Sequence, residues 1–203
     1  MRFAEFLRSE LPQCRIAYRA VDGCEGLVPN FESSAAFSVD FQRVDIVGGI
    51  LAGDGLADAI DVPACGMVAC FGFMHHVPSF ELRERALRAL VDKTALGGVA
   101  CVSFWQFMGD AKFARKAEAW HAAAIDDLAA RDRFDAAAIE PGDYFLGWQN
   151  EPGLWRYCHH FDENEIDALV ASACTGGVAE QVARFSADGK SGAMNRYVVL
   201  RRS

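Results

Sequence analysis

Strand-like and helix-like segments alternate along the first hundred residues, and this alternation constrains the fold more than any other feature of the sequence. Strands are predicted where apolar residues alternate or run together, and helices where apolar residues recur with helical spacing. The predicted strands cover residues 16–21, 36–41, 65–74 and 99–105, and the predicted helices cover residues 3–11, 51–60 and 79–91. This order predicts an α/β fold with a Rossmann-like, doubly wound and mostly parallel sheet.

Residues 65–74 form an almost unbroken apolar run. A strand that is apolar on both faces belongs in the middle of a parallel sheet that helices cover on both sides. We therefore expect a central strand here. In such a sheet a ligand lies beyond the carboxyl ends of the strands.

The second half of the chain departs from this alternation. A long helix over residues 111–131 is followed by turn signals at residues 141–142 and 151–153, which suggests a helical cap inserted at about residues 107–155. A helix over residues 163–174 then precedes two strands, residues 179–185 and 197–201, which we expect to form a C-terminal antiparallel hairpin. No linker separates the segments, so we expect one domain over residues 1–203.

The composition is that of a soluble globular protein, with 52% hydrophobic and 24% charged residues among 203. No apolar run reaches the roughly 20 residues that cross a bilayer, and the N-terminus lacks a signal-peptide pattern. These features favour the cytoplasm and no membrane partner. The seven cysteines are scattered and form no CxxC pair, so we expect buried thiols rather than a zinc knuckle or a disulfide framework.

The chain carries a net charge of −8. This charge disfavours nonspecific binding to nucleic acid, which needs clustered Lys and Arg on the phosphates. Arg83, Arg85 and Arg88 occur at near-helical spacing, but Glu81 and Glu84 alternate with them. We therefore expect a solvated helix face here rather than a basic patch.

An acidic residue ends the first predicted strand. Asp22 follows Tyr18–Val21 and is followed by Gly23. In a nucleotide-binding βαβ unit, an acid about 20 residues after a glycine-rich turn binds the ribose hydroxyls. Asp22 is a candidate for that role, and the alternative is that it only caps the turn at Gly23.

The order of these features resembles that of class I S-adenosylmethionine-dependent methyltransferases. Residues 21–27 resemble the second family motif, 44–46 the third, 69–76 the fourth, and 96–100 the glycine turn before the fifth strand. The resemblance implies S-adenosylmethionine as cofactor. It also implies cofactor contacts from strand and loop positions of three motifs: Asp22, Gly23, Asp45, Ile46, Phe71 and Gly72. Asp22 and Gly23 would lie at the ribose, Asp45 and Ile46 at the adenine, and Phe71 and Gly72 at the methionine part.

The second half resembles one branch of this family, the tRNA wobble-uridine carboxymethyl methyltransferases. Residues 143–148 and 156–161 correspond to segments that line the substrate end in that branch, with Cys158 in place of a tyrosine. The candidate catalytic residues are therefore His75, His76, Arg156, Tyr157 and His159. The acidic pI of about 5.1 disfavours tRNA as the partner and favours a small molecule or a nucleoside.

Each candidate also has a structural interpretation. His75 and His76 are adjacent, and on an extended segment they would point to opposite sides with no carboxylate at ligand spacing, so no metal site is expected. A general base, a substrate-orienting pair and loop packing stay open for them. The segment around Arg156 is either an aromatic packing corner or a substrate pocket. In a pocket, Arg156 suits a carboxylate or a phosphate, and a Trp or Tyr would stack on a planar ring.

The first family motif, a glycine-rich turn after the first strand, would align just before or at Met1, so that strand is missing from the predicted sheet. Residues 2–7 resemble what normally follows the turn. Two expectations compete: an upstream start that supplies the motif, and a truncated chain with an incomplete cofactor site. The first predicts methyl transfer to an O or N nucleophile of a small molecule or modified nucleoside, and the second a non-catalytic binding or scaffold subunit. A nicotinamide-dependent reductase is a weaker alternative.

Overall fold

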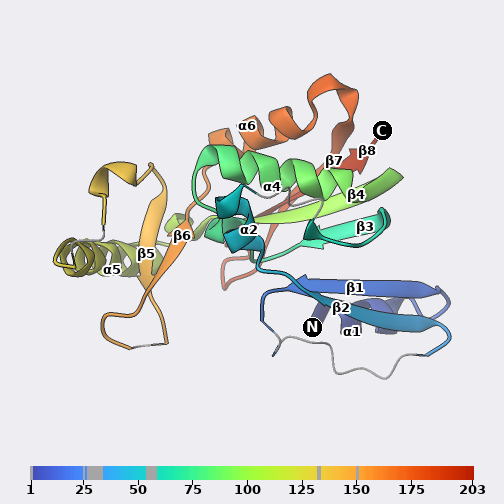
Figure 1. Ribbon diagram of the computed structural model, residues 1–203, viewed down its shortest axis with the longest axis horizontal. Coiled ribbons are helices and arrows are strands. Elements are labelled where there is room, and N and C mark those ends of the chain that lie inside the picture. Colours follow the sequence, from blue (N-terminus) through green and yellow to red (C-terminus); the bar gives the residue numbers. More distant parts are fainter. Residues whose placement is uncertain (1, 25, 27–33, 54–58, 132–133, 150) are drawn as a thin grey trace. The chain divides into compact units, whose positions relative to one another are not determined.

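The computed structural model describes residues 2–24, 26, 34–53, 59–131, 134–149 and 151–203 (Figure 1). It divides into two compact units, Met1–Pro63 and Ala64–Ser203, which we describe separately. In the described residues, no helix is both long and apolar enough to cross a membrane. All seven cysteines are free thiols. Fewer are buried than predicted: Cys70, Cys101 and Cys158 are buried, Cys65 and Cys174 are partly buried, and Cys14 and Cys24 are exposed.

The first unit contains helix α1 (Arg2–Glu10) and two parallel strands, β1 (Ile16–Asp22) and β2 (Phe37–Arg43). The strands pair in register from Ile16 opposite Phe37 to Asp22 opposite Arg43. Helix α1 and both strands lie where the sequence predicts them.

Helix α2 (Ile46–Ala52) begins earlier than the predicted helix at residues 51–60. The Asp45 carboxylate accepts a hydrogen bond from the Gly48 amide and so caps the first turn. Gly53 has a φ of +83° and ends the helix in the left-handed conformation that glycine adopts without strain. Residues 54–58 of the predicted helix lie outside the described residues.

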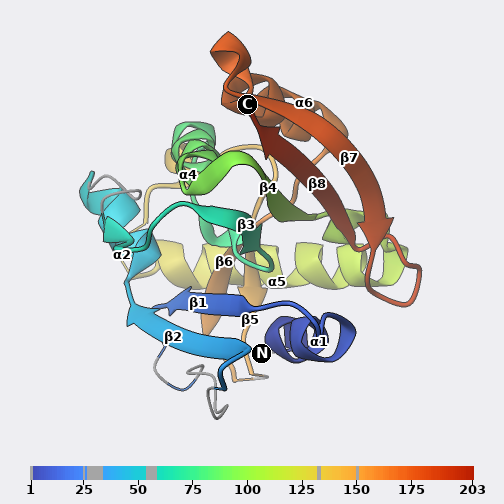
Figure 2. The ribbon, with the colours of Figure 1, turned by 90° about the vertical axis from the view of Figure 1, so that its right-hand side faces the viewer.

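The second unit is built on a four-stranded sheet in the order β3 (Cys65–Cys70), β4 (Thr94–Trp105), β8 (Asn195–Arg202) and β7 (Ala179–Ala187). Strands β3 and β4 are parallel, and the other two pairings are antiparallel. Figure 2 shows β7 and β8 side by side, which confirms the predicted C-terminal hairpin.

Strand β3 differs from its prediction as a central strand. In the sheet of the second unit, as far as it is described, β3 pairs with β4 alone, and Met67 on it is 44% exposed. The apolar run continues past the strand into a 3-10 turn, η2 (Met74–His76), where Met74 is fully buried. Part of the apolar run therefore forms the buried turn η2 rather than strand β3.

Strand β4 begins at Thr94, earlier than predicted, because Gly97 and Gly98 lie in an irregularity of the strand rather than in a turn before it. Gly97 has a φ of +75°, and the register with β3 shifts between Cys65 and Met67. These features describe a β-bulge, for which glycine is suited.

Helices α4 (Phe80–Asp92) and α6 (Glu163–Ala173) contact each other over one face of this sheet (Figure 1). Ser79 caps α4 by accepting a hydrogen bond from the Leu82 amide. The core beneath the two helices contains Leu87, Phe104 and Leu169, all at most 1% exposed. The helices at residues 79–91 and 163–174 are confirmed.

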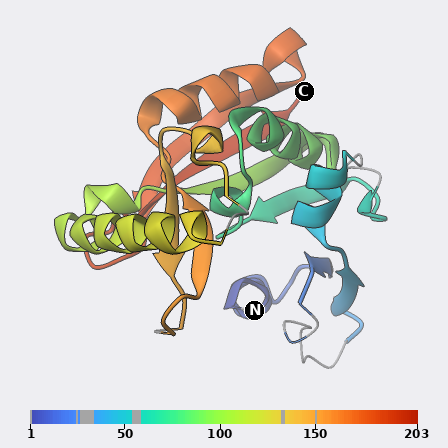
Figure 3. The same ribbon diagram turned by 60° about the vertical axis from the view of Figure 1, so that its left-hand side comes forward.

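The predicted cap region contains η3 (Phe107–Gly109), α5 (Ala111–Ala129), η4 (Ala136–Ala138) and an antiparallel hairpin of β5 (Asp143–Gly147) and β6 (Trp155–His159). Figure 3 shows α5 beside this hairpin. The turn signal at residues 151–153 is the hairpin connection. The two short strands on either side of it were not predicted.

Candidate functional site

The carboxyl ends of the parallel strands β3 and β4 carry the first candidate residues. Strand β3 leads into η2, which holds His75 and His76, and Trp105 is the last residue of β4. The His75 ring centroid lies 4.1 Å from that of His76 and 4.8 Å from that of Trp105. The structure therefore brings the histidine pair to the strand ends where α/β sheets bind ligands.

Strand β6 divides the remaining candidates, because successive side chains of a strand point to opposite faces. Arg156 and Cys158 share the face toward the histidines. The Arg156 guanidinium carbon lies 4.4 Å from the Trp148 ring centroid and 5.9 Å from that of Trp105. We call the residues on this face the histidine–arginine cluster: His75, His76, Trp105, Trp148, Arg156 and Cys158.

The histidines of this cluster are uncharged at neutral pH. Burial, followed by the neighbouring His76 and Arg156, lowers the pKa of His75 to about 3. Burial also lowers the pKa of His76, although its hydrogen bond to the Tyr157 backbone opposes this. His76 Nδ1 donates to the Tyr157 carbonyl oxygen over 3.2 Å, which leaves Nε2 with its lone pair. The lone pair of a neutral imidazole can bind a metal cation.

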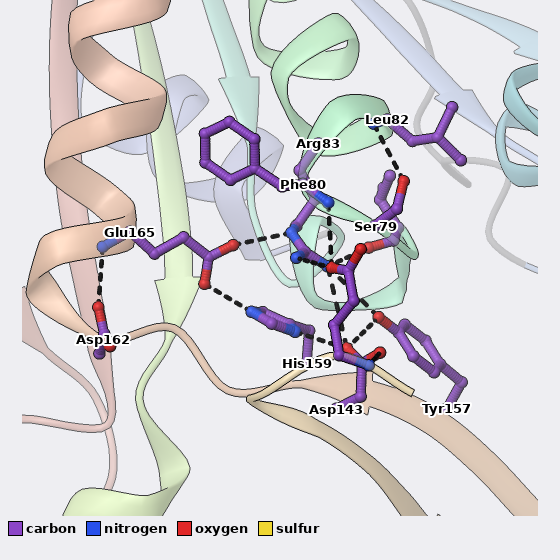
Figure 4. Close-up of polar contacts among 11 residues, drawn as sticks. Ser79, Phe80, Leu82, Arg83, Asp143, Tyr157, His159, Asp162 and Glu165 are labelled. Atoms are coloured by element: carbon purple, nitrogen blue, oxygen red, sulfur yellow. Dashed lines mark hydrogen bonds and ion pairs between the residues drawn. The ribbon is translucent and has the colours of Figure 1, made fainter. Parts of the chain in front are cut away.

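The opposite face of β6 contributes to a second group, which we call the buried ionic network (Figure 4). It comprises one arginine and the residues that pair around it: Arg83, Glu140, Asp143, Tyr157, His159 and Glu165. His159 is fully buried, with Nδ1 2.7 Å from Asp143 Oδ1 and Nε2 2.6 Å from Glu165 Oε2. The Tyr157 hydroxyl donates to the same Asp143 oxygen over 2.6 Å.

The charges of the network are mutually compensating. Burial alone would lower the pKa of His159, but its hydrogen bonds to Asp143 and Glu165 outweigh burial and raise it. Burial, followed by the hydrogen bond to Asp143, raises the pKa of Tyr157. His159 and Tyr157 therefore direct their polar atoms to carboxylates of the network. Their catalytic roles stay predictions, and the structure places both on the other face of β6 from Arg156.

Arg83 corrects the expectation of a solvated arginine face on α4. It is only 1% exposed, with ion pairs of 3.0 Å from Nη2 to Glu140 and 2.9 Å from Nε to Glu165. Arg85 and Arg88 do form the expected exposed pairs, with Glu81 and Glu84. The signal that was missed is helical spacing: Arg83 is one turn from the buried Leu87 and so occupies a position of the apolar stripe.

In the first unit, the two predicted acidic cofactor residues both make local hydrogen bonds. Asp22 ends β1, and its Oδ1 accepts from the Cys24 amide over 2.8 Å. This is the turn-capping role that the sequence left open for Asp22, and it engages one of the two carboxylate oxygens. Asp45 is the N-cap of α2, and Ile46 is the first residue of that helix. Gly23 follows the last residue of β1 directly.

In the second unit, Phe71 and Gly72 follow β3 directly. Gly72 has a φ of +66°, and its amide donates to the Ser103 hydroxyl over 2.9 Å. A Cβ at Gly72 would meet no atom within 4 Å, so the backbone faces open space. Phe71 is 39% exposed and contacts the Tyr197 ring edge-on at 5.6 Å. This is an accessible strand end of the kind that a cofactor approaches closely.

No protein-family model matches the sequence, and neither does any curated protein. Solved structures do resemble the chain. A SAM-dependent methyltransferase from Methanosarcina mazei aligns with a TM-score of 0.63 and 11% identity, over 98% of this chain and 88% of that protein. An S-adenosylmethionine-dependent methyltransferase from Clostridium acetobutylicum aligns with a TM-score of 0.52 and 8% identity, over 98% and 90% of the two chains.

A protein described as a pericyclic reaction enzyme also aligns, with a TM-score of 0.53 and 8% identity, over 98% of this chain and 40% of that protein. The three likenesses establish that this chain has the Rossmann-like α/β fold found in SAM-dependent methyltransferases, which confirms the predicted fold class. They also indicate that proteins of this fold differ in the reaction they carry out.

Proposed function

We propose that the protein transfers a methyl group from S-adenosylmethionine to an O or N nucleophile of a small molecule or modified nucleoside, and that the acceptor carries a carboxylate. The observation that carries this proposal is Arg156, which lies over Trp148 beside two uncharged histidines at the carboxyl ends of β3 and β4. The methyltransferase fold supplies the reaction class, and the histidine–arginine cluster supplies the acceptor chemistry.

Arg156 suits an anionic acceptor. A guanidinium presents a planar fork of donors that pairs with both oxygens of a carboxylate. Within the described residues, the buried Arg156 Nε has no hydrogen-bond partner, so donor capacity is left for a ligand. Stacking on Trp148 holds the plane of the fork in a defined orientation. The exposed part of Trp148, 39% of the residue, adds aromatic surface for a planar ring.

A carboxylate acceptor makes few demands on the protein. It is already anionic at pH 7, so no strong base is needed. The rate would come mainly from holding the acceptor oxygen in line with the methyl group that the bound sulfonium supplies. In this proposal Arg156 binds and orients the acceptor, and His75 and His76 line the pocket beside it.

The predicted cofactor residues fit this role in part. Gly72 presents open backbone at the end of β3, as the methionine part requires. In the described part of the chain, the Cys24 amide engages one Asp22 carboxylate oxygen, and the other could accept from a ribose hydroxyl. Asp45 and Ile46 begin α2, and we assign them to the adenine on the family resemblance alone. The competing proposal is a binding subunit without catalysis, because a fold alone does not establish an activity.

Calorimetry with S-adenosylhomocysteine, followed by transfer of a labelled methyl group to carboxylated nucleosides and small acids, tests the proposal. Replacing Arg156 by Gln should lower kcat/KM for the acceptor about 10- to 100-fold, as expected for losing a charged hydrogen-bonding group, and leave S-adenosylhomocysteine affinity unchanged. Arg85→Gln removes an exposed arginine of α4 and should change neither. Cofactor binding without transfer to any acceptor would favour the binding subunit. Absence of cofactor binding both by this chain and by a form extended upstream would refute the methyltransferase.

A further inference from the structure

We propose that His75, His76 and Cys158 form a Zn²⁺ site. One ligand atom from each of these three residues lies within 4.8 Å of the other two. Imidazole nitrogens and a thiolate sulfur are ligand types that Zn²⁺ binds in proteins, and they do not suit Mg²⁺ or Ca²⁺. This site does not depend on the proposed methyltransferase activity.

The local fold makes the three residues converge. The expectation against a metal assumed an extended segment at His75 and His76, whereas both lie in the 3-10 turn η2 with their ring centroids 4.1 Å apart. Cys158 comes from β6, which packs against η2. Ligands from a tight turn and a neighbouring strand are held by separate backbone elements, which is what a preformed site requires.

Each of the two histidines has a ring nitrogen that could bind a metal. His75 is 7% exposed, and its buried Nδ1 has no hydrogen-bond partner among the described residues. A buried polar atom without a partner is costly, and a cation would satisfy it. His76 donates its Nδ1 hydrogen to the Tyr157 carbonyl oxygen, the outer contact that typically fixes the tautomer of a metal-binding histidine.

Binding needs only small side-chain movements. Tetrahedral zinc with its usual bond lengths places ligand atoms about 3.3–3.8 Å apart, so rotations that draw the three atoms together by about 1 Å complete the site. On binding, the Cys158 S–H bond breaks, its electron pair goes to the metal and its proton goes to the buffer. Zn²⁺ with one thiolate leaves a net positive charge beside the Arg156 guanidinium. The fourth position should therefore hold an anion, either hydroxide or a carboxylate.

The competing interpretation is that Cys158 is a small hydrophobic side chain. It is fully buried in an apolar cluster with Phe107, Ala117 and Leu146. A thiol in such a cluster contributes packing without any ligand. A structural thiol predicts no metal binding, so the two interpretations give opposite results in one experiment.

The experiment uses the full chain with the exposed Cys14 and Cys24 replaced by Ser, so that surface thiols do not bind metal. The metal-free protein is titrated with Zn²⁺ against a chromogenic chelator, and with Co²⁺ as a spectroscopic probe. We expect one Zn²⁺ per chain, visible bands of tetrahedral Co²⁺ and a near-ultraviolet thiolate-to-cobalt charge-transfer band. Absence of stoichiometric binding, or Co²⁺ bound without the thiolate band, would overturn the proposal.

Single substitutions locate the metal. Cys158→Ser and His75→Asn should each weaken Zn²⁺ affinity at least about 100-fold, since even outer-contact residues contribute 10- to 100-fold. Cys174→Ser and His121→Asn are matched thiol and imidazole controls outside the site, and both should keep the affinity of the parent. Circular dichroism verifies that each variant folds. If the controls lose affinity as the ligand variants do, or if no folded ligand variant loses it, the assignment is wrong.

Discussion

Arg83 is a buried charged side chain of the second unit, and we expect its replacement to destabilise the fold strongly. Its guanidinium lies between Glu140 and Glu165 and 4.0 Å from Asp143. We expect Arg83→Leu to lower the free energy of unfolding by about 3–5 kcal/mol, because carboxylates that it neutralises would be left buried without a partner. Urea unfolding followed by circular dichroism measures this difference.

Arg85→Leu is the control, because Arg85 lies on the same helix in an exposed pair with Glu81. An exposed pair contributes at most about 1 kcal/mol, so this variant should unfold nearly as the parent does. Equal losses for the two variants would show that the buried ionic network does not stabilise the unit.

At the scale of single residues, the structure brings part of the predicted site together. His75, His76 and Arg156 lie beside two tryptophans, whereas Tyr157 and His159, predicted for the same site, lie on the other face of β6. The burial of Arg83 was missed because neighbouring glutamates suggested solvent, although its helical position favoured the core. Partners such as Glu140 come from distant loops, and helical spacing carries no signal for contacts of that range.

Among the elements, the bulge of β4 depends on a glycine that cannot be enlarged. A Cβ at Gly98 would lie 2.7 Å from the Gly66 carbonyl oxygen and 2.9 Å from that of Ala95. Because both contacts are backbone atoms, Gly98→Ala should force β3 and β4 apart and lower the thermal midpoint by several degrees, about 1–3 kcal/mol of overpacking. Gly109→Ala, whose Cβ would meet nothing within 4 Å, should change the midpoint little. Similar midpoints for both variants would contradict the bulge geometry.

The elements predicted best have strong internal periodicity. Helices α4, α5 and α6 and strands β1 and β2 lie where the apolar patterns place them. The β5–β6 hairpin was missed because each strand has only five residues and turn signals surround both. The first part of helix α2 was missed because its Gly48–Gly49 pair weakens the helical pattern, and only the cap at Asp45 shows where the helix begins.

For the molecule as a whole, the fold class follows from the order of elements, and the comparisons with solved structures agree with it. The acceptor does not follow from that order. The family resemblance includes tRNA, whereas the net charge favours a small acceptor. The two alternatives differ in a property that can be measured without activity, which is the affinity for RNA.

We expect the full chain not to bind unmodified tRNA measurably at physiological ionic strength. With a net charge of −8, the chain repels a polyanion at long range, and several of its arginines, including Arg83, Arg88, Arg184 and Arg196, are paired with carboxylates. Nonspecific binders neutralise several phosphates and reach Kd values of roughly 10⁻⁴–10⁻⁶ M.

Fluorescence anisotropy with labelled tRNA across a salt series measures this affinity, and a basic RNA-binding protein provides the positive control. A micromolar Kd that weakens steeply with salt would contradict the expectation and indicate a local basic surface. Weak binding throughout would direct the search for the acceptor to free nucleosides and small carboxylic acids, for which Arg156 provides an anion contact.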